Sequence, residues 1–378
     1  MHPTWRPTPA QADLLVAALV RDERAVEAWR RWRVAVVDVG IDAASERLLP
    51  LASVNLARRL PEDEHLYRGR VAHLRGRFSG ILLKRDAAEW ARSLAAAGVP
   101  TLALKGLALA TRYYRDFGTR PMSDIDLLVR SHDVPATLAL LHERGFTPIE
   151  DIPQTCWPPG PRAKNLGSAA FTHGCGFADA RGQQIDIHWA ALSTHCAPGS
   201  DARFWARAVP MPLPAGTLLS LCPSDELVHI IAHGLRWNHI PSIRWVADAV
   251  TLLTCEGAAF DWDLFVDEVD RRGLGIGVAP ALAVLAHYDV SIPPRIIEQV
   301  RALPATAIDR WRDAHTRWPW HQPKPLGVIA FDALRFVDGL GPVPAARQLA
   351  SYVVNRLAPD GRWRSVPVQL YGKLRARL

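Results

Sequence analysis

The stretch Asp124-Ile125-Asp126-Leu127-Leu128-Val129 places two carboxylates in an otherwise apolar run that has the character of a β-strand. Side chains alternate between the two faces of a strand, so the two aspartates are predicted to share one face while Ile125, Leu127 and Val129 enter a core. Two like charges this close repel each other unless a cation lies between them. Because oxygen ligands favour a hard ion such as Mg²⁺, the stretch predicts a metal-binding strand.

A second stretch, Gln184-Ile185-Asp186-Ile187-His188-Trp189, repeats this pattern with one aspartate. Before it, Asp179-Ala180-Arg181-Gly182 is a turn signal between two extended segments, residues 169–178 and 183–189. A hairpin is therefore predicted to carry Asp186 into the same sheet. Three carboxylates on adjacent strands would hold one or two metal ions against a nucleoside triphosphate.

A short apolar segment, Thr101-Leu102-Ala103-Leu104, ends at Lys105-Gly106 and is followed by helical periodicity as far as Tyr114. A strand followed by glycine and a helix brings backbone amides and a helix N-terminus to a place where a phosphate can bind. Lys105 and Gly106 are therefore candidate nucleotide ligands. The alternative is a tight turn with a solvent-exposed lysine, since glycine is common at such turns without any ligand.

This order of motifs, Lys-Gly, a helix, Asp-Ile-Asp and then a lone Asp in a later strand, resembles the polymerase-β-type nucleotidyltransferases. It is most similar to a bacterial subgroup, mostly of unassigned substrate, that reads Leu-Lys-Gly, then Asp-Ile-Asp-Leu-Leu-Val, then Asp-Ile-His-Trp. The resemblance extends from about Arg47 to Leu253. It implies an α+β fold, in which a polymerase-β-like core with a small mixed sheet is flanked by N-terminal and C-terminal helical regions.

The resemblance also implies roles for single residues. Asp124 and Asp126 would bridge two Mg²⁺ ions, with Mn²⁺ as the alternative metal, and Asp186 would complete the nucleophile-side ion and accept the hydroxyl proton. The broad superfamily carries Gly-Ser or Gly-Gly at the first turn, whereas this chain has Gly106-Leu107. A serine contact to the phosphate is therefore absent, and Lys105 is expected to supply positive charge instead.

Two further residues are weaker candidates for the nucleotide. Arg120 stands four residues before Asp124, in the loop that enters the strand, so its side chain can reach the opening of the same site. An ion pair with Asp116 is nearly as well supported. Ser123 is a candidate by adjacency alone, and its alternative role is to cap or turn the chain.

Three more side chains are speculative candidates for the cleft. His188 follows Asp186 by two residues and shares its face of the strand, although a hydrogen-bonded scaffold histidine is the stronger interpretation. His233 stands four residues after His229 on one predicted helix, where a polar stripe at a domain junction is favoured over a metal site. Arg244 is four residues before Asp248, so the two can pair along a helix.

Composition bounds the class of protein. The 378 residues are 49% hydrophobic and 22% charged, which is typical of a soluble protein with a substantial core, and the net charge of +7 favours polyanionic partners. No apolar run is long enough to span a membrane, and the first residues lack the order of a secretion signal, so a cytoplasmic location is expected. Five cysteines without a Cys-x-x-Cys pair suggest neither a disulfide framework nor a thiolate zinc site.

The chain is predicted to have three parts: a helical subdomain over residues 1–97, the catalytic core over 98–215 and a helical domain over 216–378. In the first part Pro50 is expected to kink or split one helix, and a long helix is predicted from His65 to Ala97. Ser224 is predicted to cap a helix at the start of the third part. The proline-rich segment Pro153–Asn165 is either a lid or a surface insertion.

The function predicted from these features is magnesium-dependent transfer of a nucleoside monophosphate from a triphosphate such as ATP to a hydroxyl acceptor. The acceptor is predicted to be a small molecule, a sugar or a peptide natural product, and the choice among them is left open. The alternatives are the same fold acting on RNA or protein, although no single-strand-binding module is indicated, and a non-catalytic nucleotide-binding scaffold. A scaffold has no need of three mutually repelling carboxylates.

Overall fold

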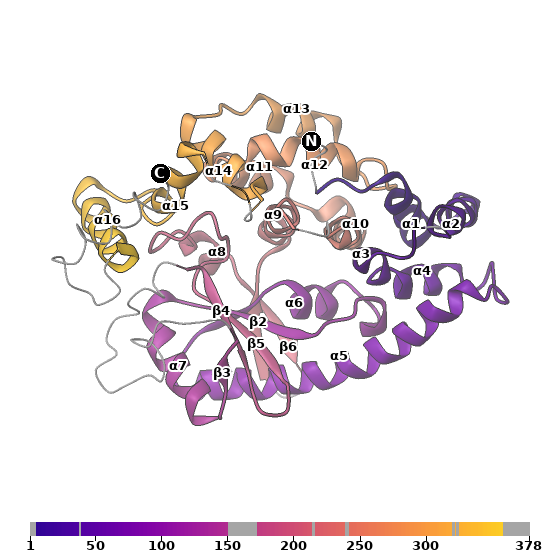
Figure 1. Cartoon of the computed structure of the whole chain (residues 1–378), viewed down its shortest axis with the longest axis horizontal. Helices are drawn as coiled ribbons and strands as arrows, with labels where there is room; N and C mark the ends of the chain where they lie inside the picture. Colours follow the sequence, from indigo (N-terminus) through magenta and orange to yellow (C-terminus); the bar gives the residue numbers. More distant parts are fainter. Residues whose placement is uncertain are drawn as a thin grey trace.

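The structure is a computed structural model that describes residues 5–37, 39–149, 172–213, 216–238, 242–319, 322 and 325–357. The predicted loop at Pro153–Asn165 lies outside these residues. A mixed sheet forms the lower half of the molecule in Figure 1, with helices α9 (Pro223–Gly234) and α10 (Arg244–Glu256) above it and the long helix α5 (His65–Ala96) below. The mixed α+β class predicted from the sequence is confirmed.

The described residues form one seven-stranded sheet in the order β3-β4-β5-β2-β1-β7-β6. Its strands are β1 (Thr101–Ala103), β2 (Asp124–Val129), β3 (Thr147–Pro148), β4 (Gly174–Ala178), β5 (Gln184–His188), β6 (Val209–Leu213) and β7 (Gly216–Ser220). β2 pairs with β5, and β1 with β7, in parallel; the other neighbours are antiparallel. The β4–β5 hairpin confirms the predicted turn, and the β2–β5 register sets Asp126 directly beside Asp186.

Proline stands at both edges of this sheet. The outer strand β3 ends at Pro148, and the opposite outer strand, β6, contains Pro210 and Pro212. Proline has no backbone N–H to donate, so it is tolerated in an edge strand and would interrupt a central one. The two proline-bearing segments therefore lie where their backbone can be accommodated.

The two faces of the strand β2 have different neighbours. Ile125, Leu127 and Val129 are fully buried in a cluster that includes Trp90 of α5 and Leu138 of α7 (Val134–Glu143). This confirms the predicted alternation of the strand. On the opposite face Leu128 packs in a smaller cluster with Phe204 of α8 (Ala202–Ala206), so the aspartates occupy only the amino-terminal end of that face.

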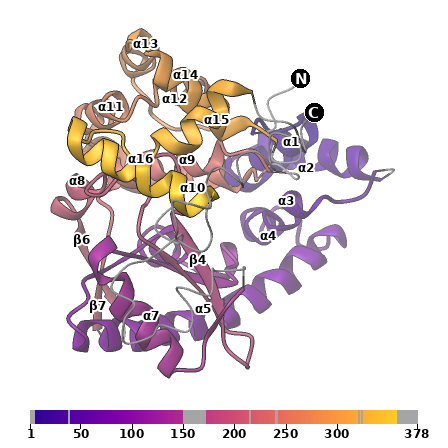
Figure 2. The same cartoon turned by 60° about the vertical axis from the view of Figure 1, so that its left-hand side comes forward.

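The N-terminal helices form a layered group above α5 (Figure 2). They are α1 (Pro9–Leu19), α2 (Glu23–Val36), α3 (Ala43–Glu46) and α4 (Leu49–Leu56). In this group α4 packs on α5 and α1 packs on α4. Pro50 lies in the first turn of α4, just after the break that separates α4 from α3, so the predicted split is confirmed. A proline in the first turn costs no hydrogen bond, because the N–H groups there have no partner within the helix.

The C-terminal helices pack against the N-terminal ones in one hydrophobic core, which contains Trp29 of α2 and Ile231 of α9. Trp5 contributes by packing on Trp245 of α10, with ring centroids 6.1 Å apart. After α10 follow α11 (Trp262–Arg271), α12 (Gly275–Leu285), α13 (Pro294–Ala302), α14 (Ala307–Arg317), α15 (Leu326–Leu334) and α16 (Pro342–Leu357). In the described part of the chain, no helix combines the length and apolarity that crossing a membrane requires.

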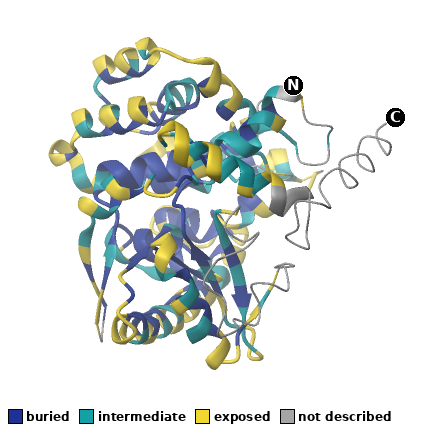
Figure 3. Ribbon diagram, turned by 90° about the vertical axis from the view of Figure 1, so that its left-hand side faces the viewer, coloured by how far each residue is buried: buried dark blue, intermediate teal, exposed yellow. Residues whose placement is uncertain are grey.

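Helix α9 lies between this helical core and the sheet, and nine of its 12 residues are buried. Figure 3 shows the same division, with buried residues running through the middle of the molecule and exposed ones on the outer helix faces. The prediction that Ser224 caps α9 is wrong. Cys222 is the cap residue, Pro223 begins the helix, and the Ser224 hydroxyl donates instead to the carbonyl of Asp261 at 2.7 Å.

Candidate active site

A pocket of about 290 Å³ opens between the sheet and helices α9 and α10. All three predicted catalytic aspartates, Asp124, Asp126 and Asp186, line it. So do Lys105, Gly106, Arg120, His233 and Arg244 among the other predicted residues. We call it the carboxylate pocket. Its remaining lining residues are Arg47, Leu109, Met122, His229, Ile230, Ser242, Trp245 and Asp248.

The carboxylates meet because β2 and β5 are parallel neighbours in register. One potential ligand atom from each of Asp126, Asp186 and His188 lies within 4.8 Å of the others. Asp124 lines the same pocket two residues earlier on β2. A side chain on the neighbouring strand would intrude here, since a Cβ added to Gly176 of β4 would lie 2.9 Å from Asp186 Oδ1.

Lys105 faces this group as the first residue of α6 (Lys105–Arg112), close after β1. Its backbone adopts a φ of +47°, a left-handed conformation that costs a non-glycine residue free energy. Its Nζ donates to Asp126 Oδ1 at 2.6 Å and lies 3.3 Å from His188 Nε2, which is 3.0 Å from the same carboxylate oxygen. The ammonium group therefore lies against a carboxylate oxygen that a metal ion would require.

The two aspartates of β2 have opposite electrostatics. Burial acts to raise the pKa of Asp126, but the charge of Lys105 and the hydrogen bond from His188 outweigh it and hold that pKa below its usual value. The pKa of Asp124 is raised, first by burial and then by the negative charge of Asp126. An additional cation near Asp124 would favour its ionised form and so oppose both effects on its pKa.

Arg120 is almost fully buried, and it pairs with Asp248 of α10 rather than with Asp116. Its Nε and Nη2 donate to the two Asp248 oxygens at 2.7 and 2.8 Å, and the Tyr114 hydroxyl donates to the same carboxylate at 2.8 Å. The alternative pairing with Asp116 is therefore wrong, because Asp116 accepts from His73 Nε2 at 2.8 Å.

One nitrogen of Arg120 remains available. Nη1 has no hydrogen-bond partner among the described residues, and it would lie 3.1 Å from a Cβ added to Gly106. Glycine at position 106 thus leaves space between the start of α6 and this guanidinium. The backbone of α6 and a buried cation face the same small region of the carboxylate pocket, an arrangement suited to an anion.

Of the predicted residues Arg244 and Ser123, only Arg244 lines the carboxylate pocket. Arg244 donates through Nη1 to the Pro121 carbonyl at 2.9 Å, and burial lowers its pKa to about 10. The expected pairing of Arg244 with Asp248 is replaced by the bonds that Asp248 accepts from Arg120 and Tyr114. Ser123 is exposed and does not line the carboxylate pocket.

The histidines differ in which space they line. His229 is buried and lines it, and burial lowers its pKa to about 3, so its ring is neutral at physiological pH. His233 opens onto both this pocket and a second one, whereas His188 lines only the second. Sequence reasoning missed Arg47 and Trp245. Arg47 lies in the turn after α3 and Trp245 in α10, both far from the aspartates in sequence, so neither carries a local signal.

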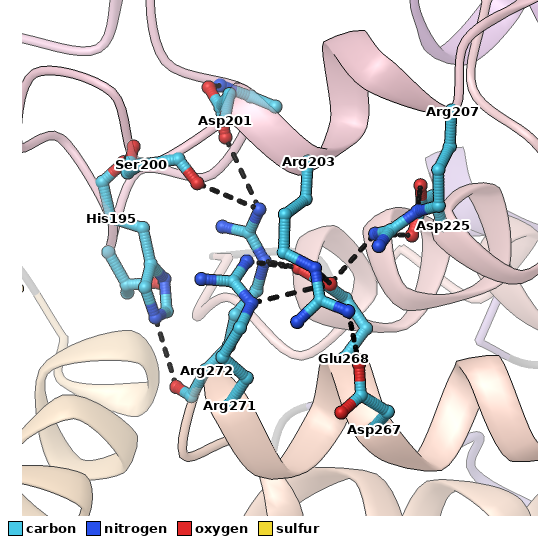
Figure 4. Close-up of polar contacts among 12 residues, drawn as sticks. His195, Ser200, Asp201, Arg203, Arg207, Asp225, Asp267, Glu268, Arg271 and Arg272 are labelled. Carbon is cyan, nitrogen blue, oxygen red and sulfur yellow. Dashed lines mark hydrogen bonds and ion pairs between the residues drawn. The ribbon is translucent and has the colours of Figure 1, made fainter.

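An ion network fixes the segment that follows β5. Figure 4 shows Glu268 of α11 surrounded by arginines: Arg207 and Arg272 bind it at 2.8 and 2.6 Å, and Arg271 also pairs with it. Arg272 approaches Asp201, and its carbonyl lies 2.9 Å from His195 Nε2. These bonds hold the 190–201 segment against α11 and the start of α12.

Comparison with known proteins identifies the class as nucleotidyltransferases. The chain belongs to the family described as "Uncharacterised nucleotidyltransferase", whose profile matches residues 43–288. The predicted resemblance to nucleotidyltransferases is confirmed, and the bacterial subgroup stays a prediction. Among solved structures, the chain is similar to an antigenic nucleotidyltransferase-like protein from Paracoccidioides brasiliensis, with a TM-score of 0.34, 11% identity, and coverage of 56% of this chain and 94% of that one. No curated protein matches the sequence.

Proposed function

We propose that this protein transfers a nucleoside monophosphate from a nucleoside triphosphate to a hydroxyl acceptor, with Mg²⁺ in the carboxylate pocket. One observation carries the proposal: Asp124, Asp126 and Asp186 line a single pocket together with the start of α6 and three arginines. This is the combination that phosphoryl-group transfer requires, because its chemistry depends on positioning and on neutralising negative charge.

The donor set fits a hard cation. Asp126 and Asp186 supply oxygen ligands whose atoms lie within 4.8 Å of each other, and Asp124 supplies more on the same strand. The Lys105 ammonium group already binds Asp126, which shows that this position attracts positive charge. When bound, Mg²⁺ would offset the charge of the reacting phosphates and lower the pKa of the attacking hydroxyl.

Residues of this chain would hold the triphosphate. The backbone of α6 at Gly106 faces the pocket with the positive end of its helix dipole. Arg120 Nη1 can donate a hydrogen bond without giving up Asp248, because that pair uses its other two nitrogens. Arg244 and Arg47 add positive charge at the same pocket. Ser123, which is outside the pocket, has no such role in the proposal.

Asp186 would receive the proton of the attacking hydroxyl. It is half-buried on β5, where the strand register pairs it with Asp126, and it lines the carboxylate pocket. His188 is fixed by its contact with Asp126 and, in this proposal, positions that carboxylate rather than reacting.

The test is transfer of label from α-labelled nucleoside triphosphates to acceptors in a lysate, with Mg²⁺, for wild type, Asp124→Asn and Asp126→Asn. We expect wild type alone to label a product, with a loss of about 10³-fold or more in either variant. Ribonuclease treatment of the product separates an RNA acceptor from a small molecule. Equal labelling by wild type and variants, or no labelling by any of them, would favour the scaffold alternative.

A further inference from the structure

A second, smaller cavity adjoins the carboxylate pocket at Lys105 and His233, which line both. Its walls come from the segment after β5, the C-terminal half of α9, the start of α12, and α14. Most of the lining is apolar, with Leu192, Leu235, Leu274, Ile276 and Val278 among the residues. The cavity volume is about 40 Å³, so it has room for one small chemical group and not for a whole nucleotide.

Arg236 is the residue in this cavity without a counter-charge. Its guanidinium makes no hydrogen bond or ion pair with any described residue, although it is half-buried. Two charged residues of α14 also line the cavity, and both are already paired: Arg312 with Asp309 and Asp338, and Asp313 with Arg317. A half-buried cation without a partner is unfavourable unless something else supplies the negative charge.

The surroundings of Arg236 reinforce this need. Burial and the nearby charge of Arg335 both lower its pKa, and Lys105 is a further cation on the cavity wall. His173 and His233 also line the cavity, and burial lowers the pKa of His173 well below its usual value. Among the described residues no carboxylate pairs with Arg236, so its positive charge is left uncompensated beside mainly apolar walls.

We propose that this cavity is an anion subsite, in which Arg236 binds a carboxylate or phosphate group of the acceptor whose hydroxyl enters the carboxylate pocket. The proposal rests on the proposed function and adds the class of substrate: a small hydroxylated anion with an apolar chain. Because Lys105 and His233 line both spaces, an anion bound at Arg236 would lie next to the carboxylate pocket that takes the triphosphate. The ion network around Glu268 fixes the wall that carries Leu192 and Gly273.

The subsite is tested on the full chain by titration calorimetry, with and without magnesium and a non-hydrolysable ATP analogue. The probes are 4-hydroxybutyrate, 4-hydroxybutyl phosphate and the neutral butane-1,4-diol. The proteins are wild type, Arg236→Gln and Arg30→Gln, the last of which removes the same charge from an exposed position on α2. Because Arg236 has no partner among the described residues, its replacement leaves no orphaned acid and the variant is expected to fold.

We expect wild type and Arg30→Gln to bind at least one of the two anions and not the diol, and Arg236→Gln to bind that anion about tenfold more weakly or worse. The preferred anion then assigns carboxylate or phosphate. Unchanged anion binding by Arg236→Gln, or no anion binding by wild type, overturns the subsite. Weakened binding of the ATP analogue by Arg236→Gln also overturns it, since Arg236 would then serve the triphosphate. If the analogue binds neither protein, the proposed function fails while the anion titrations still report on Arg236.

Discussion

Glu226 is a buried acid whose ionisation is expected to destabilise the fold. It is fully buried in α9, and neither of its carboxylate oxygens has a partner among the described residues. Burial raises its pKa to about 8, against the opposing charges of Arg112 and Arg120. The folded state holds a proton that the unfolded chain releases. The contribution of protonated Glu226 to the free energy of unfolding is therefore complete below pH 4.5 and is lost as the pH rises through about 8.

Glu226→Gln mimics the protonated form and should remove this loss. We expect the variant to be more stable than wild type by about 2–4 kcal/mol at pH 8.5, because one pKa unit corresponds to about 1.4 kcal/mol. Urea unfolding at pH 5 and 8.5 measures the difference, with the exposed Glu143→Gln as the control. Parallel pH dependence in wild type and Glu226→Gln would contradict the assignment.

A substitution at Gly176 tests the carboxylate geometry without replacing a candidate catalytic residue. In Gly176→Ala the added Cβ would lie 2.9 Å from Asp186 Oδ1, which is the end of a flexible side chain and can move. We expect transfer to fall by about tenfold to a hundredfold, because reacting groups tolerate little displacement, while the urea midpoint changes little. Transfer at the wild-type rate would show that the position of Asp186 is not critical.

Residue-level prediction from the sequence succeeded where the pattern is local. Strand alternation was enough to group Asp124 with Asp126, and the repeated motif was enough to add Asp186. The partner of Arg120 is Asp248, which is 128 residues away in the sequence, so local spacing favoured Asp116 instead. Arg236 was not among the candidates for a similar reason: its lack of a counter-charge among the described residues is visible only once the surrounding helices are placed.

At the scale of elements, Glu268 joins α11 to the segment after β5. Its carboxylate is fully buried among Arg207, Arg271 and Arg272. Despite burial, these arginines lower its pKa to about 2, so its stabilisation is present above pH 4.5 and is lost as the pH falls toward 2. Glu268→Ala leaves the arginines without their shared partner, and we expect a loss of about 3–5 kcal/mol in urea unfolding at pH 7.

The matched control for Glu268 is Asp267→Ala. Asp267 pairs with Arg203 at the surface, with about half of its side chain exposed (54%), so its loss should cost less than about 1 kcal/mol. Equal losses in the two variants would show that the buried network does not stabilise this junction.

Elements were predicted well where hydrophobic periodicity was strong, as in the 32-residue helix α5 and the β4–β5 hairpin. The start of α9 was predicted less well. Serine is a favoured cap, but Pro223 fits the first helical position and so makes Cys222 the cap and sets Ser224 inside the helix. The rule for proline outweighs the preference of serine at this position.

At the scale of the whole molecule, the N-terminal helices share one core with helices that follow the sheet. Trp5 is buried on Trp245 of α10, and the Trp245 indole N–H donates to the Trp5 carbonyl at 3.3 Å. We expect Trp5→Ala to cost about 3–5 kcal/mol and to speed amide exchange in α10 as well as in α1. Val39→Ala, at a position 82% exposed, is the control. Exchange that quickens in α1 alone would show that the two regions unfold separately.

The sequence predicts helical regions on both sides of the sheet but not their association. Helical periodicity shows which face of each helix is apolar, and the partner of that face depends on how the chain folds back over more than 200 residues, as with Trp5 and Trp245. The limits predicted for the three parts, 1–97, 98–215 and 216–378, stay a prediction.

The prolines of the outer strands bear on how copies of the protein can associate. Pro210 and Pro212 are two residues apart, so their missing amides point to the same side of β6, the rim facing away from β7. A neighbouring chain that tried to extend the sheet there would find carbonyl groups but few donors. Growth of the sheet beyond β6 into a continuous intermolecular ribbon is thereby discouraged.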